Sequence, residues 1–331
     1  MSALRQLAIG ASGILELVNT CIRPLYRWGL TRVHRAEVPV ISIGNIACGG
    51  TGKTPLVAAL ARFLVDAGKR PAILTRGYRR ESTTPQLITE PGLVSWRAVG
   101  DEPALLARAL PGVPIVVDRD RVRGAATAVR ETGATHLLLD DGFQHWRLGR
   151  DADIVVVDAH DPLAHSAPRR EPPAALRHAS GIVVNRVEDR SQAAAALAML
   201  GPWAPDAAMI ATRVVVSAVH LGGERTPAES LRGRKAVLMA GLGNPRAFVS
   251  SVGDLDVLVI DMELFPDHHR YREGELKRIL ASARAAGAIV LTTAKDVVKL
   301  PDEVAASVAW LEVELQALVG SFAELIPASV L

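Results

Sequence analysis

The feature that most constrains the fold is a glycine-rich turn that joins an apolar run to a segment with helical spacing. The apolar run begins at Val40, and the turn ends in Gly52-Lys53-Thr54. Backbone N–H groups of such a turn can surround a phosphate, while the lysine reaches the β- and γ-phosphates and the threonine hydroxyl binds Mg²⁺. The expected nucleotide-binding residues are Ala47, Cys48, Gly49, Gly50, Thr51, Gly52, Lys53 and Thr54.

This phosphate-binding loop (P-loop) departs from the usual pattern GxxxxGK[ST] at its first position, which is Ala47. Gly49 and Gly50 supply backbone freedom nearby. Pro55 is compatible with the first turn of a helix, where its missing N–H has no helical partner to lose. The alternative, a glycine-rich turn that binds nothing, is disfavoured because the apolar run and the helical segment supply the expected context.

Composition indicates a globular protein and excludes some functions. The chain has 331 residues, of which 49% are hydrophobic and 22% charged, enough for a substantial core and for two domains. Its net charge of +3 gives no reason to expect nucleic-acid binding, which needs clustered basic residues. Two cysteines are too few for a disulfide framework and indicate a reducing compartment. The oligomeric state is not specified.

The N-terminal segment predicts an amphipathic helix. Apolar residues recur there at helical spacing, at Leu4, Leu7, Ala11, Ile14, Val18, Cys21 and Leu25. Glu16 interrupts the apolar character well short of the roughly 20 residues that a bilayer span requires, and no cleavage site follows an apolar core. Nearby arginines suit a helix lying against anionic lipid headgroups. A helix packed on its own domain is the alternative, since a stripe alone does not separate the two.

Alternating strand and helix patterns predict an α/β fold with a P-loop NTPase-like, mostly parallel sheet and helices on both faces. A long β-branched run from Ala211 to His220 reads as a connecting strand, and a second α/β pattern begins at Lys235. We expect the amphipathic, membrane-associating helix in residues 1–30, as part of the first domain. The P-loop domain itself would occupy residues 31–210, linker strands 211–234 and a smaller C-terminal α/β domain 235–331.

A candidate metal site follows the apolar run Leu137-Leu-Leu139. The run ends in Asp140-Asp141, as expected of a strand whose carboxylate holds Mg²⁺ opposite the Thr54 hydroxyl. Adjacent residues of a strand point to opposite sides, so which aspartate touches the metal stays open. A simple helix-capping pair is the alternative.

A set of short motifs resembles one family. They are Gly49-Gly-Thr-Gly-Lys-Thr-Pro55, Arg76-Gly-Tyr78, Gly100-Asp-Glu-Pro103, Asp140-Asp-Gly-Phe-Gln-His145, Arg170-Glu-Pro172, Phe265-Pro-Asp-His-His269 and Lys295-Asp296. Together they span nearly the whole chain and resemble the tetraacyldisaccharide 4'-kinase (lipid A 4'-kinase) family. The resemblance implies phosphoryl transfer from ATP, with Mg²⁺, to the 4'-hydroxyl of an acylated glucosamine disaccharide 1-phosphate, which makes lipid IVA in lipid A biosynthesis. It also implies a peripheral, monotopic protein on the cytoplasmic face of the bacterial inner membrane.

The attacking sugar hydroxyl needs a proton acceptor, for which a carboxylate is suited. The family pattern pairs Asp101 with a histidine of the second domain, and the matching residue is His268; spacing alone does not separate it from His269. With Lys53 these two are the expected catalytic residues. Glu102 is a further candidate for the metal site beside Thr54, Asp140 and Asp141. The resemblance assigns Arg76 and Tyr78 to the lipid substrate. Arg170 is also expected to bind an anionic group of that substrate.

Two other classes of protein remain as alternatives. Another P-loop ATPase, ligase or GTPase would share the loop, but the GTPase motifs Asn-Lys-x-Asp and Asp-x-x-Gly have only poor matches, at Asn185-Arg-Val-Glu188 and Asp141-Gly142. An ATP-gated, membrane-associated binding protein would explain the loop and the amphipathic helix. It would leave Asp101 and His268 without a role.

Overall fold

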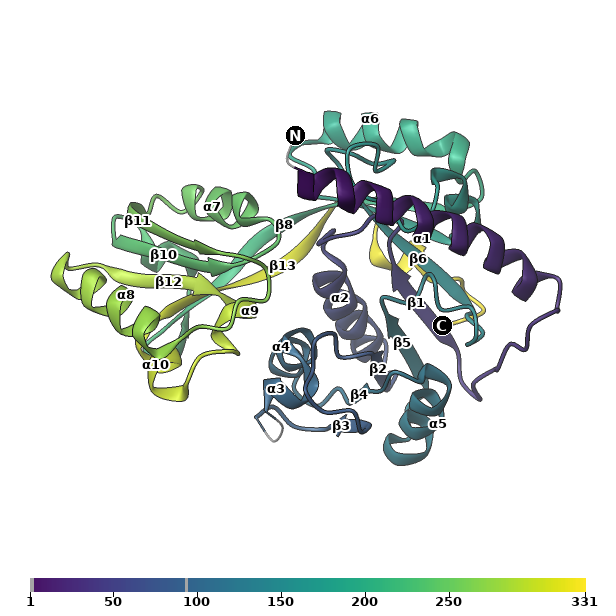
Figure 1. The fold of residues 1–331 in the computed structure, drawn as a ribbon, viewed down its shortest axis with the longest axis horizontal. Helices are drawn as coiled ribbons and strands as arrows, with labels where there is room; N and C mark the ends of the chain where they lie inside the picture. The colour runs from purple at the N-terminus through teal and green to yellow at the C-terminus, as the bar shows by residue number, and fades with distance from the viewer. Residues whose placement is uncertain (1–2, 93–94) are drawn as a thin grey trace.

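A computed structural model describes residues 3–92 and 95–331 of the chain, with side chains from residue 13 onward. Figure 1 shows two lobes joined by a pair of long strands. The described strands form one sheet in the order β11-β10-β12-β13-β8-β7-β6-β1-β5-β2-β4-β3, with β9 (Glu224–Thr226) beside β8. Most pairs are parallel; the antiparallel ones are β3 with β4, β8 with β13, and β8 with β9.

The first lobe contains the P-loop. Its strands are β1 (Val40–Gly44), β2 (Pro71–Thr75), β3 (Gln86–Ile88), β4 (Ile115–Val117), β5 (His136–Asp140), β6 (Ala152–Asp158) and β7 (Gly181–Asn185). Its helices are α1 (Ala3–Arg27), α2 (Lys53–Asp66), α3 (Trp96–Val99), α4 (Asp101–Ala109), α5 (Arg121–Thr132) and α6 (Arg190–Leu200), with 3₁₀ turns at Pro173–His178 and Gly201–Trp203.

Helices cover both faces of this sheet, as the alternation along β5 shows. Leu138 packs in the core under α2, whose buried side chains follow helical spacing at Leu56, Val57, Leu60, Ala61 and Leu64. Leu137 and Leu139 point to the other face and pack in the core that α5 covers. Fully burying a leucine side chain contributes about 1.5–3 kcal/mol, so α2 and the loop before it are held firmly on the sheet. The predicted fold class is confirmed.

The second lobe is smaller. It contains β10 (Lys235–Gly241), β11 (Leu258–Phe265), β12 (Ile289–Thr293), α7 (Pro245–Gly253), α8 (Glu273–Ala285), α9 (Ala294–Val297), α10 (Asp302–Ser307) and a 3₁₀ turn at Ala228–Leu231. A long antiparallel ribbon of β8 (Ala208–Leu221) and β13 (Ala309–Val319) joins it to the first lobe. The start of β8 extends the first-lobe sheet through β7, and the end of the ribbon joins β12.

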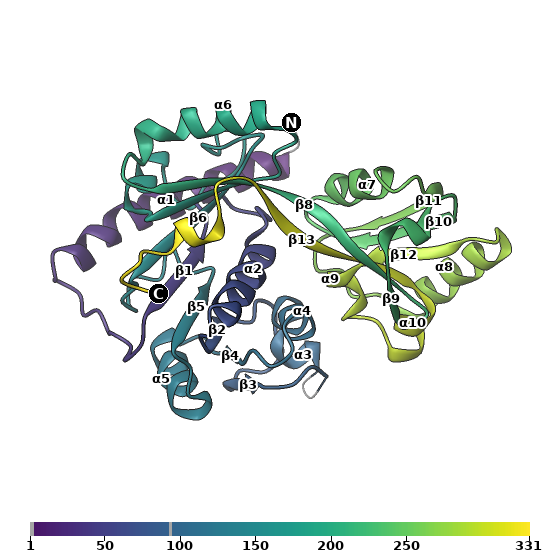
Figure 2. The same cartoon turned by 180° about the vertical axis from the view of Figure 1, so that it is seen from behind.

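The end of the chain returns to the first lobe, as seen from behind in Figure 2. After β13, the 3₁₀ turn Phe322–Leu325 leads to Ile326 and Val330, which are buried in the same core as α2. The expected C-terminal domain of residues 235–331 therefore contains a tail that packs elsewhere. We propose that the second lobe ends with β13 and that residues 320–331 belong to the P-loop lobe.

Candidate active site

The P-loop is held in a shape that only glycine permits at one key position. Gly52 has φ of 92°, in the left-handed region, and a Cβ atom there would collide with the side-chain amide of Asn185. That amide donates to the Thr51 carbonyl oxygen at 3.0 Å, while Asn45 Nδ2 donates to Thr51 Oγ1 at 3.1 Å. The loop is therefore fixed from two sides, and α2 begins directly after it at Lys53.

Lys53 and Arg170 converge on Asp141. The Lys53 Nζ lies 3.4 Å from Asp141 Oδ1, and Arg170 Nη1 donates to both carboxylate oxygens at 2.7 and 2.8 Å. Burial alone would raise the pKa of Asp141, but these two cations outweigh it and hold the pKa at about 2. Asp141 is thus an ionised carboxylate whose negative charge is matched by Lys53 and Arg170.

Asp140 has a different environment although it is the next residue. Its side chain is buried, and Thr75 Oγ1 donates to Asp140 Oδ2 at 3.0 Å. Burial, together with the nearby charges of Glu102 and Asp141, raises the pKa of Asp140 to about 7. A carboxylate in this position is stabilised by a bound cation. The donor set of Asp140, Glu102 and the Thr54 hydroxyl consists of oxygen atoms, which suit Mg²⁺.

This fit depends on the nucleotide. Within the described ranges, no three histidine, cysteine, aspartate or glutamate side chains come together as a preformed metal cluster. Mg²⁺ generally keeps several waters and binds through one or two carboxylates plus substrate phosphates. The residues present are therefore compatible with a metal that arrives with a nucleoside triphosphate.

The two lobes meet at a hydrogen-bonded pair of side chains. His268 Nδ1 lies 2.7 Å from Asp101 Oδ2, and Asp101 begins α4 with only 5% of its surface exposed. Burial would raise the pKa of Asp101, but the hydrogen bond from His268 and the charge of Lys295, whose Nζ is 4.0 Å away, lower it below its usual value. A buried, ionised carboxylate held by a histidine can accept a proton from a hydroxyl group.

The structure separates the two neighbouring histidines. His269 Nε2 contacts Glu275 Oε2 at 3.0 Å, and its ring stacks on Phe265 with centroids 4.3 Å apart. His268 instead faces Asp101, with the Tyr78 ring 5.5 Å from its own. His269 therefore packs within the second lobe, and His268 is the histidine that reaches the first.

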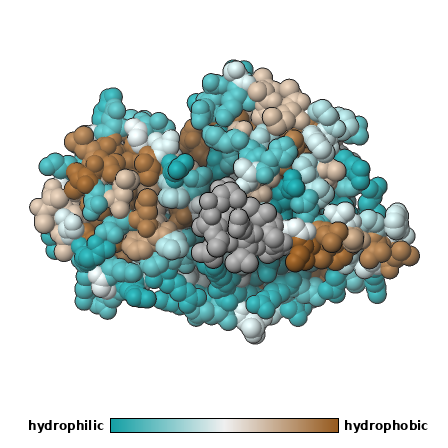
Figure 3. Space-filling view, turned by 45° about the horizontal axis from the view of Figure 1, so that its top comes forward, coloured by the Kyte–Doolittle hydropathy of each residue, from teal (hydrophilic) through white to brown (hydrophobic). Residues whose placement is uncertain are grey.

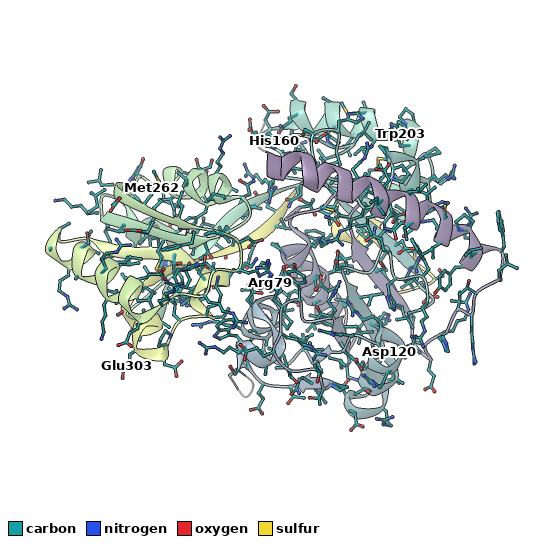
Figure 4. All side chains as sticks on the ribbon, in the orientation of Figure 1. Arg79, Asp120, His160, Trp203, Met262 and Glu303 are labelled. Carbon is teal, nitrogen blue, oxygen red and sulfur yellow. The ribbon has the colours of Figure 1, made fainter. Side chains whose placement is uncertain are left out.

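One cleft of about 1800 Å³ brings these groups together. Its lining includes the loop from Gly49 to Thr54, both aspartates of the Asp140-Asp141 pair, Glu102, Arg76, Tyr78, Arg170 and His268. Arg79, labelled in Figure 4, lies at the junction of the lobes and donates to the Asp267 carbonyl oxygen at 3.4 Å. On the second lobe, Lys295 also lines the cleft and donates to Asp267 Oδ1 at 2.9 Å.

Backbone strain is concentrated around this cleft. Six non-glycine residues in the described part of the chain have positive φ, and four of them line the cleft, namely Arg79, Asp141, Arg186 and His268. Such conformations cost about 1–3 kcal/mol each and persist where the surrounding structure imposes them, which is frequent at functional sites. The strain therefore points to the same cleft as the charged groups.

Some residues have other surroundings than the sequence suggests. Arg170, expected at the lipid substrate, is engaged by Asp141 beside the P-loop. Asp296, from the Lys295-Asp296 motif, is fully buried and accepts hydrogen bonds from the Gly241 backbone N–H and the Tyr271 hydroxyl. Asn185, which begins the poor match to the GTPase motif, supports Thr51 of the loop.

Sequence reasoning did not identify several members of the site. Thr75 binds Asp140 from the end of β2, and Lys295 had no assigned link to Asp101. Arg121, at the start of α5, is buried, which lowers its pKa to about 10 against the opposing charge of Asp140. A polar residue at the carboxyl end of a buried strand was the available signal for Thr75. Arg121 carries no such signal, because it occupies an ordinary helix start.

A P-loop on a mostly parallel sheet, with paired aspartates at the end of a neighbouring strand, defines a nucleoside-triphosphate-binding protein. The Asp101–His268 pair, whose histidine lines the same cleft, is compatible with a phosphotransferase. The profile of the tetraacyldisaccharide-1-P 4'-kinase family matches residues 4–330. The chain belongs to this family.

Individual relatives agree with the family match. A tetraacyldisaccharide 4'-kinase of Anaeromyxobacter sp. (strain Fw109-5) is 42% identical over 300 residues, which cover 88% of this chain and 81% of the relative. One from Syntrophus aciditrophicus (strain SB) is 36% identical, covering 87% and 82%. The crystal structure of LpxK from Aquifex aeolicus in complex with ATP is similar with a TM-score of 0.74, at 30% identity and 95% coverage of both chains.

Proposed function

We propose that this protein transfers the γ-phosphate of ATP to the 4'-hydroxyl of a tetraacylated glucosamine disaccharide 1-phosphate. Family membership supports this substrate and product. The observation that carries the catalytic part is the Asp101–His268 hydrogen bond of 2.7 Å, at the cleft that also contains the P-loop. One wall of the cleft thus holds the phosphoryl donor, and the other contributes a proton acceptor.

The donor side neutralises charge. Loop N–H groups from Gly49 to Thr54 and the Lys53 ammonium would surround the phosphates, and Mg²⁺ would supply further positive charge to neutralise them. Of the two aspartates, Asp140 is the better metal ligand, because Asp141 is already paired with Lys53 and Arg170. Glu102 and Thr54 complete the proposed set of protein oxygens. Arg170 orients Asp141 and Lys53 rather than binding the lipid.

The acceptor side orients the sugar and takes its proton. Asp101 accepts the proton of the 4'-hydroxyl as the oxygen attacks the γ-phosphorus, and His268 orients the carboxylate. Arg76 and Tyr78 lie at the end of β2 beside His268, with the Arg76 guanidinium 5.9 Å from the Tyr78 ring centroid. A cation next to an aromatic ring is suited to an anionic sugar headgroup, so we assign these two residues to the acceptor.

Helix α1 is proposed to bind the membrane surface. Its predicted apolar stripe is exposed where side chains are described: Ile14 is 67% exposed, Val18 42% and Leu25 40%. Leu4, Leu7 and Ala11 lie outside the described side chains. Trp28 and Leu30 follow the helix and are also exposed, and Figure 3 shows apolar side chains gathered along this part of the surface.

The exposed stripe favours a helix that turns its apolar face toward a lipid surface over one that buries this face on its own domain. Among the helices in the described part of the chain, none is long and apolar enough to cross a membrane. A peripheral position on the cytoplasmic face of the inner membrane would bring the cleft to the acylated acceptor.

The decisive experiment supplies γ-labelled ATP and the tetraacyl disaccharide 1-phosphate in mixed detergent micelles. We expect label in the lipid product, dependent on Mg²⁺, and none with Lys53→Met. ATP binding without transfer to lipid would contradict the kinase and support the ATP-gated binding protein. Release of labelled inorganic phosphate alone would indicate a P-loop ATPase.

Deleting residues 2–27 should reduce partition to anionic vesicles, and unchanged partition would count against the membrane role of α1.

A further inference from the structure

Helix α1 has a second, polar face that is buried against the first lobe. Glu16, Asn19 and Arg23 lie on this face at helical spacing, and Asn19 and Arg23 are only 8% and 7% exposed. All three contact one short segment, residues 169–171, which we call the strap. Glu16 accepts from Arg169 Nε at 3.1 Å, Asn19 Nδ2 donates to the Arg170 carbonyl oxygen at 2.9 Å, and Arg23 Nη2 donates to Glu171 Oε2 at 2.5 Å.

The strap is attached to the P-loop on its other side. The backbone N–H of Arg170 donates to the Ile46 carbonyl oxygen at 2.7 Å. Directly before the strap, the Pro168 carbonyl oxygen accepts from the Cys48 N–H at 2.7 Å. Arg169 also forms an antiparallel bridge with Ala47. The strap therefore fixes the first residues of the loop through main-chain hydrogen bonds.

Side chains of the strap also reach Asp141 and Gln144, two residues beside the phosphate site. Arg170 binds Asp141 through both oxygens, which places Asp141 next to Lys53. Glu171 accepts from Gln144 Nε2 at 2.8 Å, and the same amide donates to the Asn45 carbonyl oxygen at 3.0 Å. Each residue of the strap thus connects α1 to a different part of the nucleotide site.

The connection between Arg23 and Glu171 is shielded from water. Glu171 is 1% exposed, and the Arg23 guanidinium lies 4.5 Å from the centroid of the Phe143 ring and 5.2 Å from that of Trp146. Removing one partner of a buried ion pair leaves the other charge unmatched, so such a pair holds its elements in one arrangement. The exposed apolar stripe of α1 lies on other positions of the same helix and takes no part in these contacts.

We propose that α1 positions the phosphate site: Glu16, Asn19 and Arg23 hold the strap, and the strap holds the start of the P-loop and the Arg170–Asp141–Lys53 cluster. The helix is then a positioning element for ATP as well as a membrane-binding one. The inference rests on the proposed function only in that the P-loop binds ATP, and it does not require the lipid acceptor.

The test compares the two faces of α1 with two readouts. Affinity for a fluorescent ATP analogue with Mg²⁺ is measured without lipid, and partition is measured with vesicles of phosphatidylethanolamine and phosphatidylglycerol. We expect Arg23→Met to weaken nucleotide affinity about tenfold, within the usual range for coupling between sites, and to leave vesicle partition unchanged. Leu17 lies beside Val18 and is 64% exposed, and the double variant Leu17→Ser/Val18→Ser should give the reverse result, with lower vesicle partition and unchanged nucleotide affinity. The exposed Arg27 provides the matched control, and Arg27→Met should change nucleotide affinity less than twofold.

A second variant keeps the test valid if Arg23→Met fails to fold. Glu171→Gln keeps the size of the side chain and should weaken nucleotide affinity in the same direction, while Arg23→Lys should restore part of it. Circular dichroism checks the fold of each protein. Nucleotide affinities within twofold of wild type for both Arg23→Met and Glu171→Gln would overturn the proposal, whatever the outcome of the lipid kinase assay.

Discussion

The two walls of the cleft are built in different ways. The phosphate wall comes from one lobe, where the P-loop, Asp140 and Asp141 occupy the ends of neighbouring parallel strands and are tied together by hydrogen bonds and ion pairs. The acceptor wall needs both lobes, because Asp101 begins α4 in the first and His268 follows β11 in the second.

This difference separates binding from chemistry. The phosphate wall is complete within one lobe, so ATP binding should not depend on the second. The Asp101–His268 pair exists only when the lobes are in contact, because each lobe contributes one of the two residues. The ribbon of β8 and β13 links the lobes covalently. Closure of two lobes around a substrate commonly assembles a catalytic site in this way. Variants of the two walls should therefore fail differently.

The largest effect is expected from Lys53→Met on the phosphate wall. It removes the cation that contacts Asp141 and would contact the phosphates, so both ATP affinity and turnover should fall, with kcat/KM lower by about 10³-fold. Initial rates at varied ATP concentration measure this. Lys277→Met, on the exposed surface of α8, is the control and should be silent. A Lys53→Met protein with normal kcat/KM would contradict the role of Lys53 and the P-loop in binding the phosphates of ATP.

A smaller effect with a different signature is expected from Asp101→Asn. Loss of the proton acceptor should lower kcat by about 10²–10³-fold, as is usual for a general base. ATP affinity should stay within about twofold, because the asparagine keeps the shape of the side chain and lies outside the P-loop. Single-turnover rates and direct nucleotide binding on one preparation distinguish the two quantities. A variant with normal turnover would show that Asp101 is only a helix-start residue.

His268→Asn should lower kcat by about 10–100-fold and change its pH dependence. His268 and Lys295 hold the pKa of Asp101 below its usual value, so the ionised base of the wild type persists to low pH. Without His268, burial dominates and the pKa of Asp101 rises, which moves the acid limb of the pH–rate profile to higher pH. His269→Asn is the matched control because it should leave that limb in place. An unmoved limb in His268→Asn would contradict the assignment.

The smallest effect concerns the stability of the nucleotide-free protein. The pKa of Asp140 is about 7 in the folded state against about 3.9 in unfolded chains, so the folded state binds the extra proton between these values. The free energy of unfolding should fall as the pH rises from about 4 to about 7, by on the order of 1.4 kcal/mol per unit of that difference at most. Urea unfolding in EDTA measures it. Asp140→Asn should flatten the profile, whereas Asp206→Asn on the surface should not.

Much of the fold follows from local pattern. The positions of β2, β4, β5, β6 and β7 were predictable because buried parallel strands are short apolar runs between helical segments. The short strand β3 was missed because it is antiparallel to β4 and only partly buried. β13 was missed although Leu311, Val313 and Leu315 alternate with Glu312 and Glu314, a strand pattern that stands outside the β–α alternation. The return of Leu325 and Val330 to the first core was not predictable either, since local sequence does not specify which of two cores an apolar tail joins.

The candidate site also contains residues that the sequence predicts and contacts that it does not. The P-loop and Asp140-Asp141 are contiguous motifs whose chemistry is readable from spacing, whereas the pairing of Asp101 with His268 spans 167 positions and came from family resemblance. The contact of Arg23 with Glu171, which depends on three-dimensional burial, had no sequence signal. Spacing thus identifies the wall that one lobe builds, and the structure is needed for contacts between distant segments.

The most direct test of the two-wall account is a double-mutant cycle between Asp101 and His268 on the rate of labelled phosphate transfer to the tetraacyl disaccharide. If the two residues act as one unit across the lobes, the Asp101→Asn/His268→Asn protein should lose about as much kcat as Asp101→Asn alone, because the histidine acts through the aspartate. Losses that multiply would show that the residues act independently. That result would contradict a catalytic pair assembled from both lobes.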